Sequence, residues 1–257
     1  APAGRDPGGP QTQAGVAPRI KARLRVPVIG FLQGEDTFLD GLGPQWSGVV
    51  WRLLAERMRD ADLWIAPSTY FRDLMARRLY WSESEAASLV RCVPNGLSLE
   101  GYPTQPKTER EDAVKHVPTV GYLARMVQNK GLGLLVDAFL LLKKRNSVPG
   151  LRLRCAGSMT AYDEEYVRRL RDTIDRAGCA ADVDWAPNLD RAQKIAFLCA
   201  LDVFSVPATY SEAFGLYAIE AMAAGVPVVL PNASAFPEIV GITQGGIVFD
   251  LAENNAK

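Results

Sequence analysis

Two carboxylates, Glu212 and Glu220, stand in the stretch TYSEAFGLYAIEAMAAGVPVV, whose other residues are almost all apolar or small. Residues 215–224 have the pattern of a helix that is apolar nearly all round, so we expect Glu220 to be buried. A buried charge is costly unless it has a fixed partner. Two interpretations of Glu220 follow: an internal ion pair, or a carboxylate that accepts hydrogen bonds from the hydroxyls of a sugar ligand.

The start of this helix offers a second kind of chemistry, because its first N–H groups have no partner inside the helix. Gly215 and Leu216 supply two of these groups, and a helix N-terminus favours an anion such as phosphate. Glu212 follows a predicted strand, at the sheet edge where ligands bind in parallel α/β folds. The alternative for Glu212 is a surface carboxylate stabilised by the helix dipole.

Two cations follow another predicted strand, in the stretch GYLARMVQNKGLGLL. Arg125 and Lys130 flank a short loop, and Gly131 permits a close approach of the backbone before the next helix. They are either two solvated basic residues or a clamp for a pyrophosphate. Their expected position at the same sheet edge as the start of helix 215–224 favours the clamp.

Several common kinds of catalytic site are absent from the sequence. His116 is the only histidine, which argues against a Ser-His-Asp triad, a Cys-His dyad and a histidine-rich metal site. Neither half opens with GxGxxG, and there is no Walker loop. The four cysteines form no CxxC pair, so we expect reduced core thiols in a cytoplasmic protein, without zinc or disulfides. They are Cys92, Cys155, Cys179 and Cys199.

The charge balance argues against nucleic-acid partners. Lys and Arg total 29, and Asp and Glu also total 29, so the chain as a whole does not attract polyanions. The basic run RIKARLR (19–25) is interpreted as a solvated lead-in to a strand. Asp202 interrupts the best apolar run, so we expect no transmembrane segment.

The order of strand-like and helix-like runs predicts a parallel α/β protein with two domains. Residues 1–25, rich in Gly and Pro, are expected to be a flexible lead-in. The first half then predicts strands at 26–33, 63–67 and 89–96, and helices at 46–60 and 69–80, with Ser68 as an N-cap. The polar stretch 97–116 is predicted to be an interdomain linker.

The second half, 117–257, alternates more regularly. It predicts strands at 118–123, 151–157, 183–186, 201–207, 226–231 and 245–250, with helices at 131–145, 162–177, 190–200, 215–224 and 234–240. Six strands with intervening helices form a doubly wound sheet, which binds ligands at the carboxyl ends of its strands.

The motifs resemble those of a known family. EAFGLYAIEAMAAGVPVV is similar to the E-x7-E signature of family 4 retaining glycosyltransferases, and GYLARMVQNKGL is similar to their phosphate loop. The likeness runs from about Val26 to the C-terminus and includes DLWIAPSTYFRDLM and VRCVPNGLSLEGY. The resemblance implies a GT-B fold of two Rossmann-like domains, of which 26–116 would be part of the first and 117–257 a truncated second.

The resemblance also implies roles for single residues. Arg125 and Lys130 would hold the donor diphosphate, Glu212 would contact the hydroxyls of the donor sugar, and Glu220 would bind the ribose diol. The backbone of Phe214, Gly215 and Leu216 would assist. The reaction would be transfer of a hexose from a nucleotide sugar to an acceptor hydroxyl, with retention and with no metal or other cofactor. The acceptor would be a glycan, a lipid or a small molecule.

Two departures from the family pattern qualify these expectations. Many relatives carry a histidine after a strand of the first domain, whereas this chain reads FLQGEDTFLDG, which makes Glu35 and Asp36 candidates for contact with acceptor or donor. The chain is also short for the family, so we expect a fragment, and peripheral membrane contact would belong to its missing N-terminal part. The alternatives are a non-catalytic nucleotide-sugar-binding fragment and a sugar-nucleotide epimerase.

Overall fold

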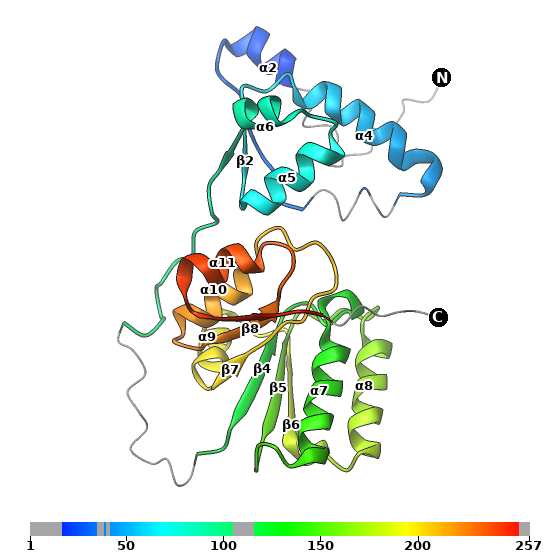
Figure 1. Ribbon diagram of the computed structural model, residues 1–257, viewed down its shortest axis with the longest axis vertical. Coiled ribbons are helices and arrows are strands. Elements are labelled where there is room, and N and C mark those ends of the chain that lie inside the picture. Colours follow the sequence, from blue (N-terminus) through cyan, green and yellow to red (C-terminus); the bar gives the residue numbers. More distant parts are fainter. Residues whose placement is uncertain (1–16, 35–38, 40–41, 105–115, 252–257) are drawn as a thin grey trace. The chain divides into compact units, whose positions relative to one another are not determined.

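The computed structural model describes residues 17–34, 39, 42–104 and 116–251 (Figure 1). These residues divide into two compact units. The first comprises the chain up to Asn95 together with Glu212–Phe214, and the second comprises Gly96–Ser211 and the chain from Gly215 onward.

The first unit contains a three-stranded parallel sheet in the order β1-β2-β3. Its strands are β1 (Ile29–Phe31), β2 (Leu63–Ala66) and β3 (Val90–Cys92), and its helices are α2 (Ala17–Leu24), α4 (Pro44–Met58), α5 (Thr69–Arg78) and α6 (Glu83–Leu89). Phe71 and Met75 of α5 and its C-cap residue Leu79 are almost completely buried, so this segment supplies much of the core of the unit. The predicted N-cap is confirmed, because the Ser68 side chain accepts a hydrogen bond from the backbone N–H of Phe71 at 3.0 Å.

Three expectations for the first unit are wrong. Residues 17–24 form helix α2 and not a flexible lead-in, and Lys21 anchors this helix by an ion pair with Asp62 at 2.8 Å. Residues 83–89 form helix α6, which leaves only Val90–Cys92 of the predicted strand 89–96. Cys92 is exposed and not a core thiol, because it stands at the end of the shortened strand.

Helix α6 begins with a capping box, and the carboxylate of this box also bonds a residue at the end of α4. Ser82 accepts a hydrogen bond from the Glu85 N–H, and the Glu85 carboxylate accepts one from the Ser82 N–H at 2.8 Å. Arg59, just beyond α4, donates to the same carboxylate at 3.0 Å. The Ser82 backbone N–H, followed by Arg59, lowers the pKa of Glu85 to about 2 from an ordinary value of 4.5.

Glu85→Gln should therefore remove a pH-dependent part of the stability of the first unit. A carboxyl whose pKa is lowered on folding stabilises the fold above its unfolded pKa, and this contribution is lost as the pH falls from about 4.5 to about 2. The gap in melting temperature between wild type and variant should be largest above pH 5 and close toward pH 2. Tryptophan fluorescence would measure it, with Glu83→Gln in the same helical turn as the control. A gap that stays constant from pH 6 to pH 2 would contradict this assignment.

The second unit is built on a six-stranded parallel sheet in the order β6-β5-β4-β7-β8-β9. The strands are β4 (Thr119–Leu123), β5 (Arg152–Gly157), β6 (Val183–Pro187), β7 (Val203–Phe204), β8 (Val228–Pro231) and β9 (Gly246–Phe249). Numbered along the chain, this is the order 3-2-1-4-5-6 of the Rossmann fold, and it confirms the predicted doubly wound sheet. The strand order reverses between β4 and β7, the position where such sheets bind ligands.

Helices cover both faces of this sheet. They are α7 (Leu132–Arg145), α8 (Glu164–Arg176), α9 (Arg191–Cys199), α10 (Leu216–Ala223) and α11 (Phe236–Thr243), with short 3-10 turns η2 (Gln128–Lys130) and η3 (Ala180–Asp182). In Figure 1, α7 and α8 lie on one side of the strands, and α9, α10 and α11 lie on the other. Each predicted helix of this half is confirmed, with ends that differ by a few residues.

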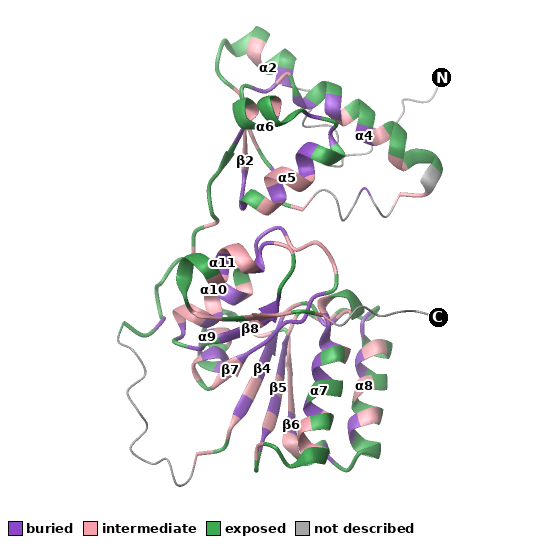
Figure 2. Ribbon diagram, in the orientation of Figure 1, coloured by how far each residue is buried: buried purple, intermediate pink, exposed green. Residues whose placement is uncertain are grey.

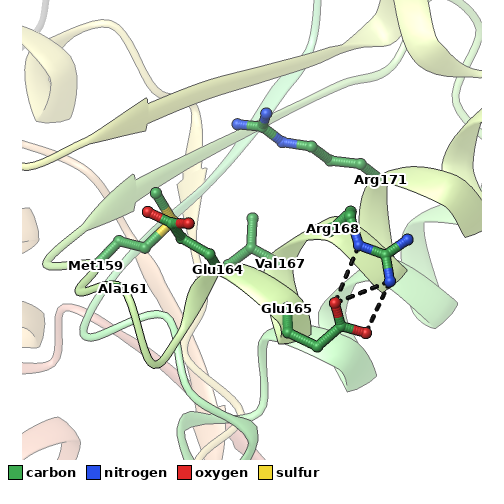
Figure 3. A pocket seen from close by; sticks show the side chains of 7 residues that line it. All are labelled: Met159, Ala161, Glu164, Glu165, Val167, Arg168 and Arg171. Atoms are coloured by element: carbon green, nitrogen blue, oxygen red, sulfur yellow. Dashed lines mark hydrogen bonds and ion pairs between the residues drawn. The ribbon is translucent and has the colours of Figure 1, made fainter.

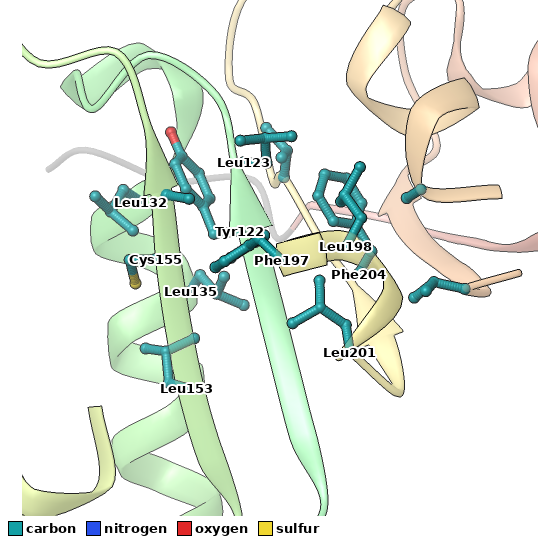
Figure 4. Packing of buried hydrophobic residues seen from close by; sticks show 14 of the residues in the cluster. Tyr122, Leu123, Leu132, Leu135, Leu153, Cys155, Phe197, Leu198, Leu201 and Phe204 are labelled. Carbon is teal, nitrogen blue, oxygen red and sulfur yellow. The ribbon is translucent and has the colours of Figure 1, made fainter. Parts of the chain in front are cut away.

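The core of the second unit lies between the sheet and these helices, and buried residues line the central strands in Figure 2. Figure 4 shows Tyr122 and Cys155 of two neighbouring strands beside Leu132 and Leu135 of α7, with Phe197 of α9 nearby. Almost complete burial of these apolar side chains is the main stabilising contribution to this unit. It gives the loops at the carboxyl ends of the strands a rigid support.

The described start of the predicted linker is fixed to the second unit. Arg191, the first residue of α9, donates to the carbonyl oxygens of Ser98 and Glu100 at 3.0 and 2.9 Å. Tyr102 is buried in the core cluster of the same unit. The change between the two units therefore falls at Asn95 and Gly96, close to the start of the predicted linker.

Candidate active site

A cavity of about 530 Å³ lies at the carboxyl ends of the strands of the second unit. Residues after three neighbouring strands line it, and α9 and α10 complete its wall. The lining residues are Leu123, Ala124 and Arg125 at the end of β4, Gly157 and Ser158 at the end of β5, Asn188 and Leu189 after β6, Lys194 of α9, and Leu216, Tyr217 and Glu220 of α10. The position agrees with that expected of a ligand site in a doubly wound sheet.

Both interpretations of Glu220, an ion pair and a carboxylate accessible to a ligand, agree with the structure. Its side chain is only 14% exposed and forms an ion pair with Lys194, whose Nζ donates to Oε1. Both side chains nevertheless line the cavity, so the ion pair lies at the wall of a site and not in the middle of the core. A ligand in the cavity can therefore reach this carboxylate.

A third polar group, the phenol of Tyr102, lies near this pair. The Tyr102 hydroxyl is buried, and the described residues offer it no hydrogen-bond partner. Burial and, second, the negative charge of Glu220 raise the pKa of Tyr102. Tyr102 is therefore a neutral phenol close to the Glu220 side of the cavity.

Arg125, in the loop after β4, brings a positive charge to the cavity wall. The Tyr122 hydroxyl donates to the Arg125 carbonyl at 2.9 Å, which fixes the backbone after β4. The guanidinium is 55% exposed, and its Nη2 lies 3.5 Å from Oδ1 of buried Asp163. The Thr160 backbone N–H lowers the pKa of Asp163 most, and Arg125 adds to the effect. This long contact leaves Arg125 with N–H donors for an anion.

Lys130 does not line the cavity but packs against Tyr217, which does. Its Nζ donates to the Tyr210 hydroxyl and lies 4.6 Å and 5.1 Å from the ring centroids of Tyr210 and Tyr217. Tyr217 itself lines the cavity. The structure thus brings Arg125, Leu216 and Glu220 into one cavity and places Lys130 one side chain away from it.

Two glycines allow the loops around the cavity to come close together. Gly131 has φ 75°, and a Cβ atom there would lie 1.9 Å from the Pro207 carbonyl oxygen, which confirms the predicted close approach. Gly157 has φ 136°, and a Cβ atom there would lie 1.7 Å from the Ala124 carbonyl oxygen. Either side chain would push a cavity loop away, so both positions require glycine.

The start of α10 differs slightly from the prediction. Gly215 is the N-cap in a left-handed conformation, with φ 83°, and the helix begins at Leu216. Glu212 and Phe214 do not line the cavity and group with the first unit, where the Ser68 hydroxyl donates to the Ala213 carbonyl at 2.7 Å. Their roles stay predictions. Glu35 and Asp36 lie outside the described residues.

Sequence reasoning missed part of the cavity wall. Gly157 ends one predicted strand and Asn188 follows another, so the position at the carboxyl end of a strand is the signal that points to both. The Asn188 side chain bonds the Met159 backbone at both its N–H and its carbonyl, at 2.9 and 3.1 Å, and so joins two of the loops. Lys194 gave no sequence signal, because it stands inside a predicted helix and belongs to no recognisable motif.

A second cavity in this unit, of about 470 Å³, has a different character. Figure 3 shows that Glu165 and Arg168 on α8 are joined to each other beside it. Arg168 is 60% exposed and is also paired with Asp172 at 3.0 Å, so its charge is already balanced at the surface. This cavity is lined mostly by residues of α8 and not by the carboxyl ends of several neighbouring strands, where doubly wound sheets bind ligands.

Within the described part of the chain, no group of three or more His, Cys, Asp or Glu side chains is arranged to hold a metal ion. Among the same residues, no helix combines the length and the apolar character that crossing a membrane requires.

Comparison with known proteins identifies relatives of the chain. The profile of a family described as "Glycosyl transferases group 1" matches residues 105–256. Among curated proteins, a phosphatidyl-myo-inositol mannosyltransferase of Propionibacterium freudenreichii subsp. shermanii is 32% identical over 60% of this chain and 35% of its own length. A GDP-mannose-dependent alpha-(1-6)-phosphatidylinositol monomannoside mannosyltransferase of Mycobacterium tuberculosis is 29% identical over 80% of this chain and 53% of its own.

Solved structures give the same result for the fold. HepE of Anabaena in complex with UDP has a TM-score of 0.73 and 25% identity, over 95% of this chain and 64% of its own. Sucrose-phosphate synthase of Thermosynechococcus elongatus, at 21% identity, has a TM-score of 0.70 over 96% of this chain and 60% of its own, which supports the fold. The predicted α/β fold of GT-B type is thereby confirmed. The chain spans between 35% and 53% of the length of the two curated relatives above.

Proposed function

The chain belongs to the group 1 family of glycosyl transferases, and on this premise we propose that it moves a hexose from a nucleoside-diphosphate sugar to an acceptor hydroxyl. We propose further that the anomeric configuration is retained and that no metal is needed. The observation that carries the proposal is the cavity at the strand ends, which combines the Glu220 carboxylate with the Arg125 guanidinium.

The two charges suit the two polar parts of such a donor. A carboxylate accepts hydrogen bonds from a ribose diol, and a guanidinium forms paired bonds with phosphate oxygens. Arg125, Lys130 and the first N–H groups of α10 would supply positive charge to the diphosphate, which becomes the leaving group. Glu212 would contact the hydroxyls of the donor sugar, with the Phe214, Gly215 and Leu216 backbone assisting.

In this proposal the protein accelerates transfer by positioning and by charge stabilisation, without a protein nucleophile. The acceptor hydroxyl attacks the anomeric carbon as the bond to the diphosphate breaks, and the departing diphosphate takes the proton. The names of the relatives support a nucleotide sugar, since one is GDP-mannose-dependent and the HepE structure holds UDP. We place the reaction in the cytoplasm, where such donors and reduced cysteines are both expected.

Calorimetric titration with UDP, GDP and ADP, with and without EDTA, tests the proposal. We expect one nucleotide to bind clearly more tightly than the others and its dissociation constant to be the same in EDTA. No binding of any of the three by a sample shown to be folded by circular dichroism would overturn the donor-site assignment. Binding that disappears in EDTA would overturn the metal-independent part.

A further inference from the structure

Only one of the two oxygens of the Glu220 carboxylate accepts a hydrogen bond from the described residues. Lys194 donates to Oε1, whereas the described residues give Oε2 no hydrogen bond. Both side chains line the cavity, and they are only 14% and 26% exposed, respectively. A carboxylate with so little exposure is costly without a fixed partner, and the Lys194 ammonium group is that partner.

Lys194 is itself held in place. It lies in the first turns of α9, which starts with a capping box between Asp190 and Gln193. Arg191 ties the same turn to the Ser98 and Glu100 carbonyls. Helices α9 and α10 are in contact, so the fold brings this ammonium group to this carboxylate. Because Glu220 balances its charge, Lys194 is a poor anion binder compared with half-exposed Arg125.

We propose that Lys194 is a positioning residue of the donor site, which holds the Glu220 carboxylate in one orientation so that Oε2 accepts hydrogen bonds from the ribose hydroxyls. The inference rests on the proposed function, because it takes the ligand to be a ribonucleoside diphosphate. Its specific consequence is that discrimination between ribose and 2′-deoxyribose depends on Lys194, which contacts neither hydroxyl in this arrangement.

Lys194→Met tests this consequence, because methionine keeps most of the side-chain volume without the charge. The probes are the nucleoside diphosphate that binds in the titration above and its 2′-deoxy form, measured by calorimetry on the full chain. Wild type should prefer the ribose form by about ten- to a hundredfold, as expected of a charge-assisted hydrogen bond. The variant should bind the ribose form more weakly and prefer it by only about threefold or less.

Three further variants make the result specific. Lys194→Arg keeps the charge. The logarithm of its preference for the ribose form over the 2′-deoxy form should be at least half of the wild-type value. Lys143→Met is the matched control, since Lys143 forms a 2.7 Å ion pair with Asp182 and is 22% exposed but does not line the cavity. It should leave the preference unchanged. If Lys194→Met does not fold, Lys194→Gln replaces it, with a smaller loss of preference expected.

The outcomes separate this inference from the function on which it rests. Wild-type binding with a clear preference for ribose, retained in Lys194→Met or Lys194→Gln, overturns the role of Lys194 and leaves the donor site intact. A preference lost equally in Lys143→Met would mean a general effect on stability and would also overturn it. If folded wild type binds no nucleotide, the proposed function itself fails.

Discussion

Replacing Arg125 and Lys130 together by alanine is expected to weaken binding of the nucleoside diphosphate by about a hundredfold and to leave binding of the nucleoside nearly unchanged. Each side chain would lose charge-assisted bonds to phosphate, worth about 1.5 to 3 kcal/mol when shielded from water. Arg125 is 55% exposed, so its share should be at the lower end.

Calorimetry with the diphosphate and with the nucleoside measures this difference. Arg168→Ala is a suitable control, because Arg168 is similarly exposed and lies in the same unit but is paired with Glu165. The melting temperature should fall slightly, because Lys130 also lies over two tyrosine rings, contacts worth about 0.5 to 1 kcal/mol near the surface. Equal losses for diphosphate and nucleoside, or unchanged affinity, would contradict the diphosphate assignment.

Glu220→Gln is expected to weaken nucleotide binding by about ten- to a hundredfold, because the neutral amide is a weaker acceptor for the ribose hydroxyls. The substitution keeps the shape of the side chain and leaves Lys194 without its counter-charge. Stability should therefore fall as well, by about 1 to 2 kcal/mol for a pair at a cavity wall that water reaches.

A double variant separates the two effects of Glu220. Glu220→Gln combined with Lys194→Met removes both charges and should recover part of the lost stability, since an unpaired buried charge no longer remains. Its nucleotide affinity should stay as low as that of Glu220→Gln. Thermal melting and calorimetry on the same samples decide between the roles. If the folded fraction of Glu220→Gln binds the nucleotide with wild-type affinity, Glu220 does not bind the ribose and serves only as an ion-pair partner of Lys194.

The sequence predicted the second unit better than the first, for physical reasons. Short runs rich in apolar and β-branched residues predict strands, so 118–123 and 151–157 were recognised almost to the residue, although Arg152 and Arg154 interrupt the second run. Helix α6 was missed although SESE contains the S-x-x-E signature of its capping box. Helix α2 is short, and its three basic residues were interpreted as a solvated run, whereas the structure anchors it by a long-range ion pair between Lys21 and Asp62.

The candidate site was predictable where it rests on local motifs. Arg125, Gly131 and Glu220 stand in recognisable sequence surroundings, and the structure places them at or beside one cavity. Lys194 was not predictable, because its pairing with Glu220 depends on how α9 and α10 pack across 26 residues of sequence separation. The burial of Tyr102 beside them is likewise a result of tertiary packing, which no local pattern encodes.

A crystal structure of this chain with the nucleoside diphosphate that binds most tightly tests the central claim most directly. We predict the ribose hydroxyls within hydrogen-bond distance of Glu220, Lys194 still on the other carboxylate oxygen, and the phosphates beside Arg125 and the start of α10. A nucleotide bound elsewhere, with the Glu220–Lys194 pair closed off from it, would contradict the account.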